Sequence, residues 1–325
     1  MPSDETSTFY VGRRVLVTGG SGFLGTAVLA RLAAAGADDV VAPSSADYDL
    51  RERAATEAMF DEVEPELVIH LAARVGGIGA NQIHPSELYL DNLLMGTYVI
   101  DEALRHDTPK TVVVGTICSY PKFTPVPFSE DSLFQGYPEE TNAPYGIAKL
   151  AQLVQLQSNR DQFGQNGIYL MPTNLYGPGD KFHPAVSHVI PALVKKCVEA
   201  VEAGADEIVV WGTGSASREF LYVDDAADGI VLAAERYDGA EPVNLGANHE
   251  MPIRELVDHI AAATGFDGTI TWDTSKPDGQ PRRRVDASRA AGAFGFSAST
   301  DFAEGLTRTV AWYRANRAAA EQRDH

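Results

Sequence analysis

The 325-residue sequence contains little cysteine and little positive charge. Its two cysteines, Cys118 and Cys197, are too few for a disulfide framework, so we expect reduced thiols. Only 26 Lys and Arg stand against 45 Asp and Glu, which gives a formal net charge of −19. Such a surface argues against a general nucleic-acid or anionic-membrane binder, because phosphate repels it. Local basic pockets can still bind an anionic small molecule.

The sequence also lacks any apolar run of about eighteen residues, so no transmembrane helix is expected. Its first residues, MPSDETSTFYVGRR, lack the basic and apolar regions of a secretory signal, and we expect a cytoplasmic protein. The hydrophobic fraction of 44% is ordinary for a globular protein and excludes a largely disordered chain. The length predicts one large domain or two of ordinary size.

Runs rich in β-branched residues and leucine alternate along the first half of the chain with segments of helical periodicity. The strand-like runs are residues 14–18, 40–41, 67–71, 111–114 and 167–171. The helical segments are residues 27–35, 54–63, 88–104 and 145–163. Continuous apolar strands alternating with helices predict an α/β fold, with a doubly wound parallel sheet covered on both faces.

A glycine loop follows the first predicted strand and opens the first helix: Gly19-Gly20-Ser21-Gly22-Phe23-Leu24-Gly25. Glycine allows a tight turn and a close approach of backbone to a pyrophosphate, whose charge is favoured at a helix N-terminus. The order strand, loop and helix predicts a Rossmann-type dinucleotide site. The alternative is a tight turn that binds nothing.

The end of the second predicted strand bears on the choice of nicotinamide cofactor. An acidic residue there would bind a ribose 2′-hydroxyl and select NAD. Residues 41–45 (VAPSS) contain no acid, which favours NADP(H), but they contain no arginine for a 2′-phosphate either. Ser44 and Ser45 are the candidates to hold that phosphate, and NAD(H) is not excluded.

Tyr145 and Lys149 form a YxxxK motif within a predicted helix. Residues four apart share a helix face, so the ammonium is expected near the phenol, where it would lower the pKa of the tyrosine. Such a tyrosine can exchange a proton with a carbonyl/alcohol pair while hydride moves to or from nicotinamide. The motif alone is common, and a surface Tyr/Lys pair is the alternative.

With these motifs the chain resembles the extended short-chain dehydrogenases/reductases and, more narrowly, the GDP-L-fucose synthase family of GDP-4-keto-6-deoxy-D-mannose 3,5-epimerase/4-reductases. Eight stretches carry the resemblance in order: GGSGFLG, HLAARVGGIGAN, GTICSYPK, NAPYGIAK, MPTNLYGPGDKFHP, SHVIPAL, VVWGTGSASREFLYVDD and SKPDGQPR. The resemblance runs from about residue 14 to residue 313, nearly the whole chain.

The resemblance implies conversion of GDP-4-dehydro-6-deoxy-D-mannose to GDP-L-fucose by 3,5-epimerisation and then NADPH-dependent reduction at C4. It implies that Cys118 and His188 are the acid/base pair of epimerisation. Tyr145 and Lys149 would serve the reduction, with Thr116 in the place where the family usually has serine. Ser21 replaces an expected basic residue in the glycine loop.

The resemblance also assigns binding residues. The implied cofactor contacts are Gly19, Gly20, Ser21, Gly22, Phe23, Leu24, Gly25, Ser44, Ser45, Asp49, Leu50, Leu71, Ala72, Ala73, Val114, Gly115, Lys149, Pro172, Thr173, Asn174, Leu175 and His188. The implied contacts to the GDP-sugar are Lys196, Trp211, Arg218 and Asp278. No metal site is expected.

After about Pro172 the apolar runs become shorter, at residues 208–211, 219–223 and 243–245, and glycine and proline become denser. We therefore expect residues 12–175 to form the NADP-binding Rossmann domain, with a return of the chain near 220–232. Residues 176–319 are then mainly a smaller C-terminal α/β substrate-binding lobe. By analogy with the family, helices 88–104 and 145–163 would pair two subunits in a homodimer.

Two other functions fit part of this evidence. A nucleotide-sugar epimerase with tightly bound NAD, either a GDP-mannose 3,5-epimerase or a 4-epimerase, would also use the cofactor and a cysteine. A cofactor-binding sensor without chemistry would usually lack the Tyr or Lys that this chain keeps. A 4,6-dehydratase is less favoured, because residues 116–118 (TIC) offer no acidic residue for elimination.

Overall fold

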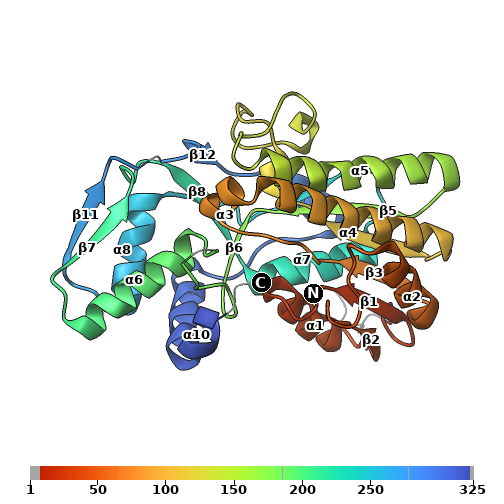
Figure 1. Cartoon of the computed structure of the whole chain (residues 1–325), viewed down its shortest axis with the longest axis horizontal. Helices are drawn as coiled ribbons and strands as arrows, with labels where there is room; N and C mark the ends of the chain where they lie inside the picture. Colours follow the sequence, from red (N-terminus) through yellow and green to blue (C-terminus); the bar gives the residue numbers. More distant parts are fainter. Residues whose placement is uncertain (1–7, 185, 277, 323–325) are drawn as a thin grey trace.

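The computed structural model describes residues 8–184, 186–276 and 278–322. Its main feature is a six-stranded sheet in the order β2-β1-β3-β4-β5-β9, in which every neighbouring pair is parallel (Figure 1). The strands are β1 (Arg14–Thr18), β2 (Asp39–Val41), β3 (Leu67–His70), β4 (Lys110–Val114), β5 (Gly167–Pro172) and β9 (Val243–Leu245). This arrangement confirms the predicted Rossmann-type sheet.

Helices cover both faces of the sheet, as the alternation of its side chains requires. Val15 and Val17 of β1 pack with α1 (Phe23–Ala34) and α7 (Val223–Arg236) on one face. Leu16 packs with α2 (Arg53–Val63) and α4 (Pro85–Arg105) on the other, where α5 (Ala143–Phe163) lies beside α4. All three side chains of β1 are fully buried, which is why this strand is apolar without interruption.

The predicted elements of the first half are confirmed, with shifted ends. Helix α1 begins at Phe23 rather than at residue 27, because Gly22 is its extended N-cap and the glycines of the first turn dilute the apolar pattern. Helix α4 extends from Pro85 to Arg105 and α5 from Ala143, each with a proline in its first turn. Proline is well tolerated there, since the first amide has no intrahelical partner.

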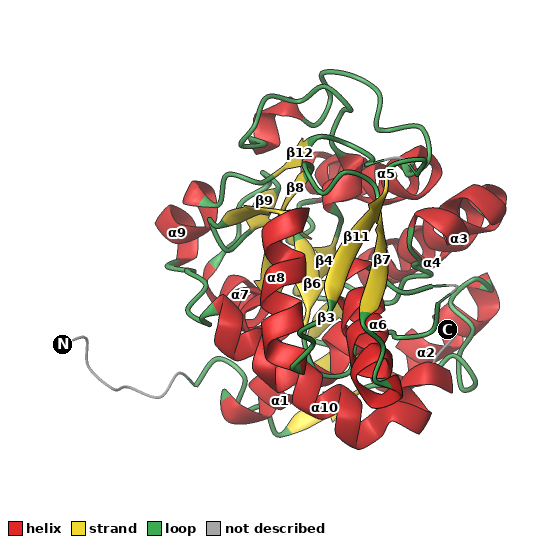
Figure 2. Cartoon of the chain, turned by 90° about the vertical axis from the view of Figure 1, so that its left-hand side faces the viewer, coloured by secondary structure: helices red, strands yellow, loops and turns green. Residues whose placement is uncertain are grey.

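Much of the chain after β5 builds a second apolar cluster. Its helices and strands group together in front of the first sheet in the view of Figure 2. Its parallel strand pair is β7 (Glu207–Trp211) with β11 (Thr269–Asp273), and its helices are α6 (Val189–Ala203), α8 (Ile253–Thr264) and α10 (Phe302–Gln322). Strand β8 (Ser217–Tyr222) lies between β10 (Glu250–Pro252) and β12 (Arg282–Arg283) and also pairs with β6 (Asn174–Tyr176).

The chain passes between the two regions more than once. Helix α7 packs against α1, and β9 completes the first sheet beside β5, although both follow β6, β7 and β8 in sequence. The division into a cofactor-binding and a substrate-binding region remains a prediction. Among the described residues, no helix combines the length and apolar character that spanning a lipid bilayer requires.

Short elements connect the larger ones: α3 (Ile78–Ile83), the 3-10 turns Ile117–Ser119 and Glu130–Ser132, and α9 (Ser288–Phe294). Ala185, between two of the family-like stretches, and Pro277, within another, lie outside the described residues.

Candidate active site

The glycine loop follows the carboxyl end of β1, which lies within the sheet between β2 and β3. Gly19 has a left-handed φ of +74°, and a Cβ there would come within 2.7 Å of the Ala72 backbone nitrogen. A Cβ at Gly25 would overlap the Gly19 carbonyl oxygen. Glycine is therefore required for the loop to fold back onto the first turn of α1.

This loop fits the phosphates of a dinucleotide. Gly22 caps α1 in an extended conformation, and no side chain caps the first amides of the helix. Free amides and the positive end of the helix dipole are the usual partners of a pyrophosphate. Gly22 presents only backbone at this surface, where Ser21 is exposed, while Gly20 is buried beneath them against Ala42 and Leu29. The predicted loop residues therefore form one continuous cradle, with Phe23 and Leu24 half-buried behind it.

At the end of β2 the structure places a carboxylate that the sequence interpretation did not include. Asp47 accepts hydrogen bonds from the Ser44 backbone amide at 2.9 Å and from the Ser44 hydroxyl at 2.7 Å. These bonds lower the pKa of Asp47, so it is ionised at neutral pH. Ser44 is thus already engaged, while Ser45 is exposed. The region that would receive a ribose 2′-group holds a negative charge.

The remaining residues assigned to the cofactor lie at the carboxyl edge of the sheet. Asp49 is paired with Arg51, and the Leu50 side chain is buried in the core, so only its backbone is open to a ligand. Leu71, Ala72 and Ala73 follow β3, Val114 and Gly115 end β4, and Pro172, Thr173, Asn174 and Leu175 join β5 to β6. Thr173 donates its amide to the Leu245 carbonyl at 2.9 Å, which ties this connection to β9.

Tyr145, Thr116 and Cys118 come together where β4 ends and α5 begins. The Thr116 hydroxyl accepts a hydrogen bond from the Cys118 amide at 3.2 Å and caps the short 3-10 turn that carries the cysteine. A hydrogen bond also links Thr116 to the Tyr145 phenol. Helix α5 can approach the turn that carries Cys118 closely because residue 146 is glycine. The Ser119 hydroxyl also donates a hydrogen bond to the Gly146 carbonyl at 2.9 Å.

The pKa of Tyr145 differs from the predicted direction. Burial raises this pKa above its usual value, the nearby Cys118 adds to the rise, and the hydrogen bond with Thr116 opposes it. The expectation that Lys149 lowers the pKa of the tyrosine is therefore wrong for the protein in this state. A protonated phenol at neutral pH is the form that donates a proton.

Lys149 lies fully inside the protein, only 1% exposed. Its ammonium donates a hydrogen bond to the Val114 carbonyl oxygen at 3.0 Å, and burial lowers its pKa to about 8. The lysine backbone carbonyl in turn accepts a hydrogen bond from Tyr169 of β5 at 2.8 Å. The side chain is thus fixed beneath the ends of β4 and β5, where the nicotinamide end of a dinucleotide is expected.

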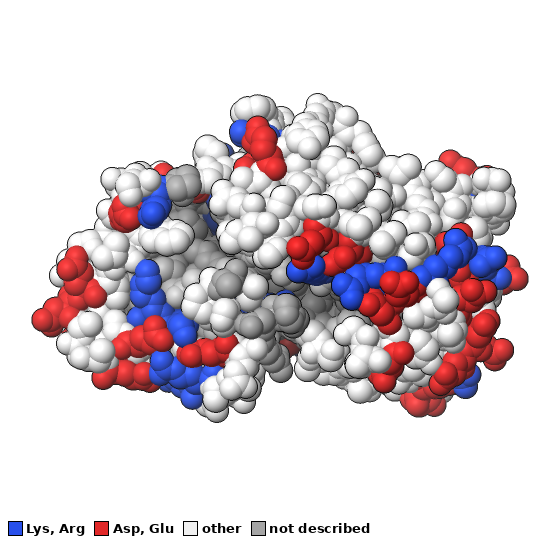
Figure 3. Space-filling model, in the orientation of Figure 1, with Lys and Arg blue, Asp and Glu red and all other residues white. Residues whose placement is uncertain are grey.

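His188 is the N-cap of α6, in the second region. Its side chain is solvent-exposed. The surrounding protein, together with Lys181, lowers the pKa of His188, so the imidazole is neutral at pH 7. Figure 3 shows this face of the molecule hollowed between the region of α6, β7 and α8 and the region of α4.

Two arginines of the second region lie opposite each other on neighbouring strands. Arg283 of β12 is the direct register partner of Arg218 of β8. Arg218 donates to the Asp278 carbonyl at 3.3 Å, and burial followed by the charge of Arg283 lowers its pKa to about 10. Sequence reasoning selected Arg218 but missed Arg283, which follows directly after the SKPDGQPR stretch.

The other residues assigned to the GDP-sugar are dispersed over this region. Lys196 of α6 donates its ammonium to the Val209 carbonyl of β7 at 2.6 Å. Trp211 ends β7 with 68% of its surface exposed. The Asp278 carboxylate accepts two hydrogen bonds from Thr213, both 2.7 Å, and so holds the turn that follows Trp211.

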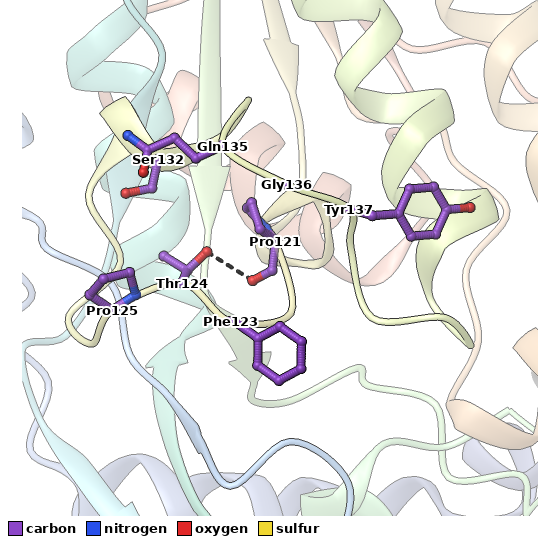
Figure 4. A pocket seen from close by; sticks show the side chains of 8 residues that line it. All are labelled: Pro121, Phe123, Thr124, Pro125, Ser132, Gln135, Gly136 and Tyr137. Atoms are coloured by element: carbon purple, nitrogen blue, oxygen red, sulfur yellow. Dashed lines mark hydrogen bonds between the residues drawn. The ribbon is translucent and has the colours of Figure 1, made fainter.

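Residues 121–137 form a loop region that continues from the cysteine. It contains a pocket of about 150 Å³, lined by Pro121, Phe123, Thr124, Pro125, Ser132, Gln135, Gly136 and Tyr137 (Figure 4). The Thr124 hydroxyl donates to the Pro121 carbonyl at 2.8 Å across this turn. None of the predicted site residues lines this pocket. Among the described residues, no group of three or more His, Cys, Asp or Glu is arranged to hold a metal ion.

Comparison with known proteins agrees with this geometry. Residues 15–246 match the NAD dependent epimerase/dehydratase family. The chain is 43% identical over 314 residues to GDP-L-fucose synthase 1 of Arabidopsis thaliana, covering 97% of each chain. It is 36% identical to GDP-L-fucose synthase of Escherichia coli K12, covering 94% of this chain and 97% of the relative. The structure of a GDP-L-fucose synthetase from Naegleria fowleri bound to NADP superposes with a TM-score of 0.88 at 29% identity, covering 96% and 97% of the two chains.

Proposed function

The chain belongs to the NAD dependent epimerase/dehydratase family, within the group of GDP-L-fucose synthases, and from this we propose the reaction that its site performs. It converts GDP-4-dehydro-6-deoxy-D-mannose to GDP-L-fucose, by 3,5-epimerisation followed by reduction at C4. Its cofactor is NADP(H). The observation that carries the proposal is the meeting of Thr116, Cys118 and Tyr145 at the carboxyl edge of the sheet, beside the glycine loop.

Epimerisation is assigned to Cys118 and His188. The C4 ketone of the substrate makes the protons on C3 and C5 acidic, since the electrons left behind are delocalised onto the ketone oxygen. A thiolate at Cys118 removes such a proton and becomes a thiol. His188 first takes up a proton from solvent. As the imidazolium it then gives that proton to the opposite face of the carbon, which inverts the centre and leaves the neutral imidazole.

Reduction is assigned to the residues at the start of α5. The cofactor, when bound, supplies the hydride for C4. Tyr145 donates its phenolic proton to the C4 oxygen, for which its raised pKa is suited. Thr116 donates a hydrogen bond to the same oxygen, and Lys149 supplies a fixed positive charge beneath the nicotinamide end of the site.

The nucleotide end of the substrate is assigned to the second region. Arg218 supplies a planar guanidinium for the diphosphate, a geometry that binds phosphate oxygens in pairs. Lys196 adds positive charge, and the exposed face of Trp211 offers a packing surface for base or ribose. Asp278 acts on the same part of the site through the turn that it holds.

Two further statements belong to this proposal. The protein acts as a homodimer through α4 and α5, which lie side by side and carry exposed apolar residues, among them Leu90 and Val154. It acts in the cytoplasm, where NADPH is available and where the free thiols Cys118 and Cys197 stay reduced.

The test is an incubation with GDP-4-dehydro-6-deoxy-D-mannose and NADPH in deuterated water, followed by absorbance and by NMR of the product. Consumption of NADPH together with deuterium at C3 and C5 of a fucose-configured product is the expected result. Deuterium incorporation without oxidation of NADPH or NADH would assign a pure epimerase instead. If neither occurs, at low or high salt, the substrate assignment is wrong.

A further inference from the structure

Arg283 makes a contact that the proposed chemistry does not yet use. Its Nη1 lies 3.9 Å from the Cys118 sulfur, although the two residues are 165 positions apart in sequence. Cys118 is half-buried, so the residue is partly accessible to solvent while its sulfur contacts the guanidinium. A nearby cation is one of the main causes of a reactive, low-pKa cysteine.

The guanidinium is held in place from its other side. Its Nε and Nη2 donate to the Gln280 side-chain oxygen at 3.2 and 3.1 Å. Gln280 in turn donates to the Lys122 carbonyl at 2.9 Å, in the loop that follows the cysteine. This chain of hydrogen bonds fixes the planar fork, so that one of its terminal nitrogens points at the sulfur.

The positive charge of Arg283 is not neutralised by a carboxylate. Within the part of the chain that the structure describes, Arg283 forms no ion pair, whereas its neighbour Arg282 is paired with Glu250. The Cys118 sulfur receives the contact from Arg283 on β12, and the Tyr145 phenol on α5 lies close enough for the cysteine to raise its pKa. Arg218 stands beyond Arg283 as a second cation.

We propose that Arg283 stabilises the thiolate of Cys118 and thereby makes it an effective base near neutral pH. This inference rests on the proposed function, since it gives a role to the same cysteine. Arg283 acts through Cys118 and is a positioning residue in this sense. A structural role alone, in which the guanidinium only ties β12 to the loop at Lys122, would leave the titration of the thiol unchanged.

The experiment measures the rate of alkylation of Cys118 by iodoacetamide as a function of pH, on the full chain without substrate. The other cysteine, Cys197, is fully buried and should react slowly. The Cys118→Ser variant measures any alkylation of Cys197, which is then subtracted. In Arg283→Met we expect the apparent pKa of the thiol to rise by about one, with roughly tenfold slower alkylation below both pKa values. Arg283→Lys should keep most of the wild-type rate. The control is Arg282→Met, which removes a neighbouring exposed charge and should titrate as wild type.

An unchanged thiol pKa in Arg283→Met would overturn the inference. If that variant does not fold, as judged by circular dichroism, Arg283→Gln replaces it under the same criterion. Deuterium exchange into the substrate separates the two proposals. If Cys118→Ser loses deuterium exchange but the pKa of the Cys118 thiol is unshifted in Arg283→Met, only the role of Arg283 is wrong. If the pKa of the Cys118 thiol is shifted in Arg283→Met but Cys118→Ser retains deuterium exchange, only the role of the cysteine as base is wrong.

Discussion

A side chain at position 146 would overlap the carbonyl oxygen of Cys118, so the turn of α5 that carries Tyr145 lies directly against the loop that carries the cysteine. The two halves of the proposed reaction thus share one contact. Tyr145, the proposed proton donor for reduction, and Cys118, the proposed base for epimerisation, can lie this close because Gly146 has no Cβ.

Gly146→Ala should therefore impair both half-reactions. The added methyl pushes α5 away from the loop, and a displacement of about 1 Å at a catalytic group can cost up to roughly 100-fold in rate. We expect at least about a tenfold loss of both NADPH oxidation and deuterium exchange. Gly292→Ala is the matched control, since that helical glycine meets no atom within 4 Å. Equal activity of the two variants would show that the contact is unimportant.

Tyr145→Phe should separate the two half-reactions. Without the phenolic proton, reduction at C4 should fall by about 100-fold or more. Deuterium exchange at C3 and C5 should persist, because Cys118 and His188 are intact. The measurement is NADPH oxidation and NMR in deuterated water, with Cys118→Ser as the reciprocal variant. Retention of full reductase activity in Tyr145→Phe would remove the tyrosine from the mechanism.

Lys149→Met should change how stability depends on pH. The pKa of the buried ammonium is about 8, below the ordinary 10.5 that it regains on unfolding. The unfolded chain therefore binds more protons between these values, and the stability of the wild type rises with pH in this interval. At pH 7 the buried charge costs up to about 3 kcal/mol, which Lys149→Met removes.

Chemical denaturation of the cofactor-free protein between pH 7 and pH 9.5 measures this difference. The variant should be the more stable protein at pH 7, and its advantage should shrink as the pH increases. Lys276→Met, a change at an exposed lysine, serves as the control. If wild type and Lys149→Met have the same pH slope, the ammonium does not carry a depressed pKa.

Asp47→Asn should raise the preference for NADPH over NADH. The Asp47 carboxylate sits on Ser44, where a 2′-phosphate would otherwise find an amide and a hydroxyl. Removing its charge removes a repulsion, and we expect the ratio of kcat/KM values to shift toward NADPH by roughly fivefold. Glu57→Gln, on an exposed position of α2, controls for net charge. An unchanged ratio would place the phosphate elsewhere.

Val154→Glu should dissociate the proposed homodimer. Val154 is 46% exposed on α5, and burying a carboxylate at a subunit interface is costly unless it is paired. Sedimentation velocity should show a wild-type dimer and a predominantly monomeric variant. Val201→Glu, at a similarly exposed position on α6, should remain a dimer. A monomeric wild type would contradict the proposal directly.

The sequence by itself determined the parts of the protein that depend on neighbouring residues. Strand β1 was predicted with its observed bounds, because the buried apolar residues Val15, Leu16 and Val17 stand together just before a glycine loop. Tyr145 and Lys149 could be placed on one helix, since a spacing of four fixes their relation. The glycine loop was recognisable because its residues act through consecutive backbone groups.

The tertiary structure decided what depends on distant residues. It brought Arg283 to Cys118, set β9 beside β5, and placed Asp47 on Ser44 at the site where the sequence suggested only hydroxyls. It also reversed the expected pKa shift of Tyr145, because burial and the nearby Cys118 raise this pKa by more than the hydrogen bond with Thr116 lowers it. The local sequence pattern cannot predict such contacts, because the burial of a side chain and the charges near it depend on residues from the whole chain.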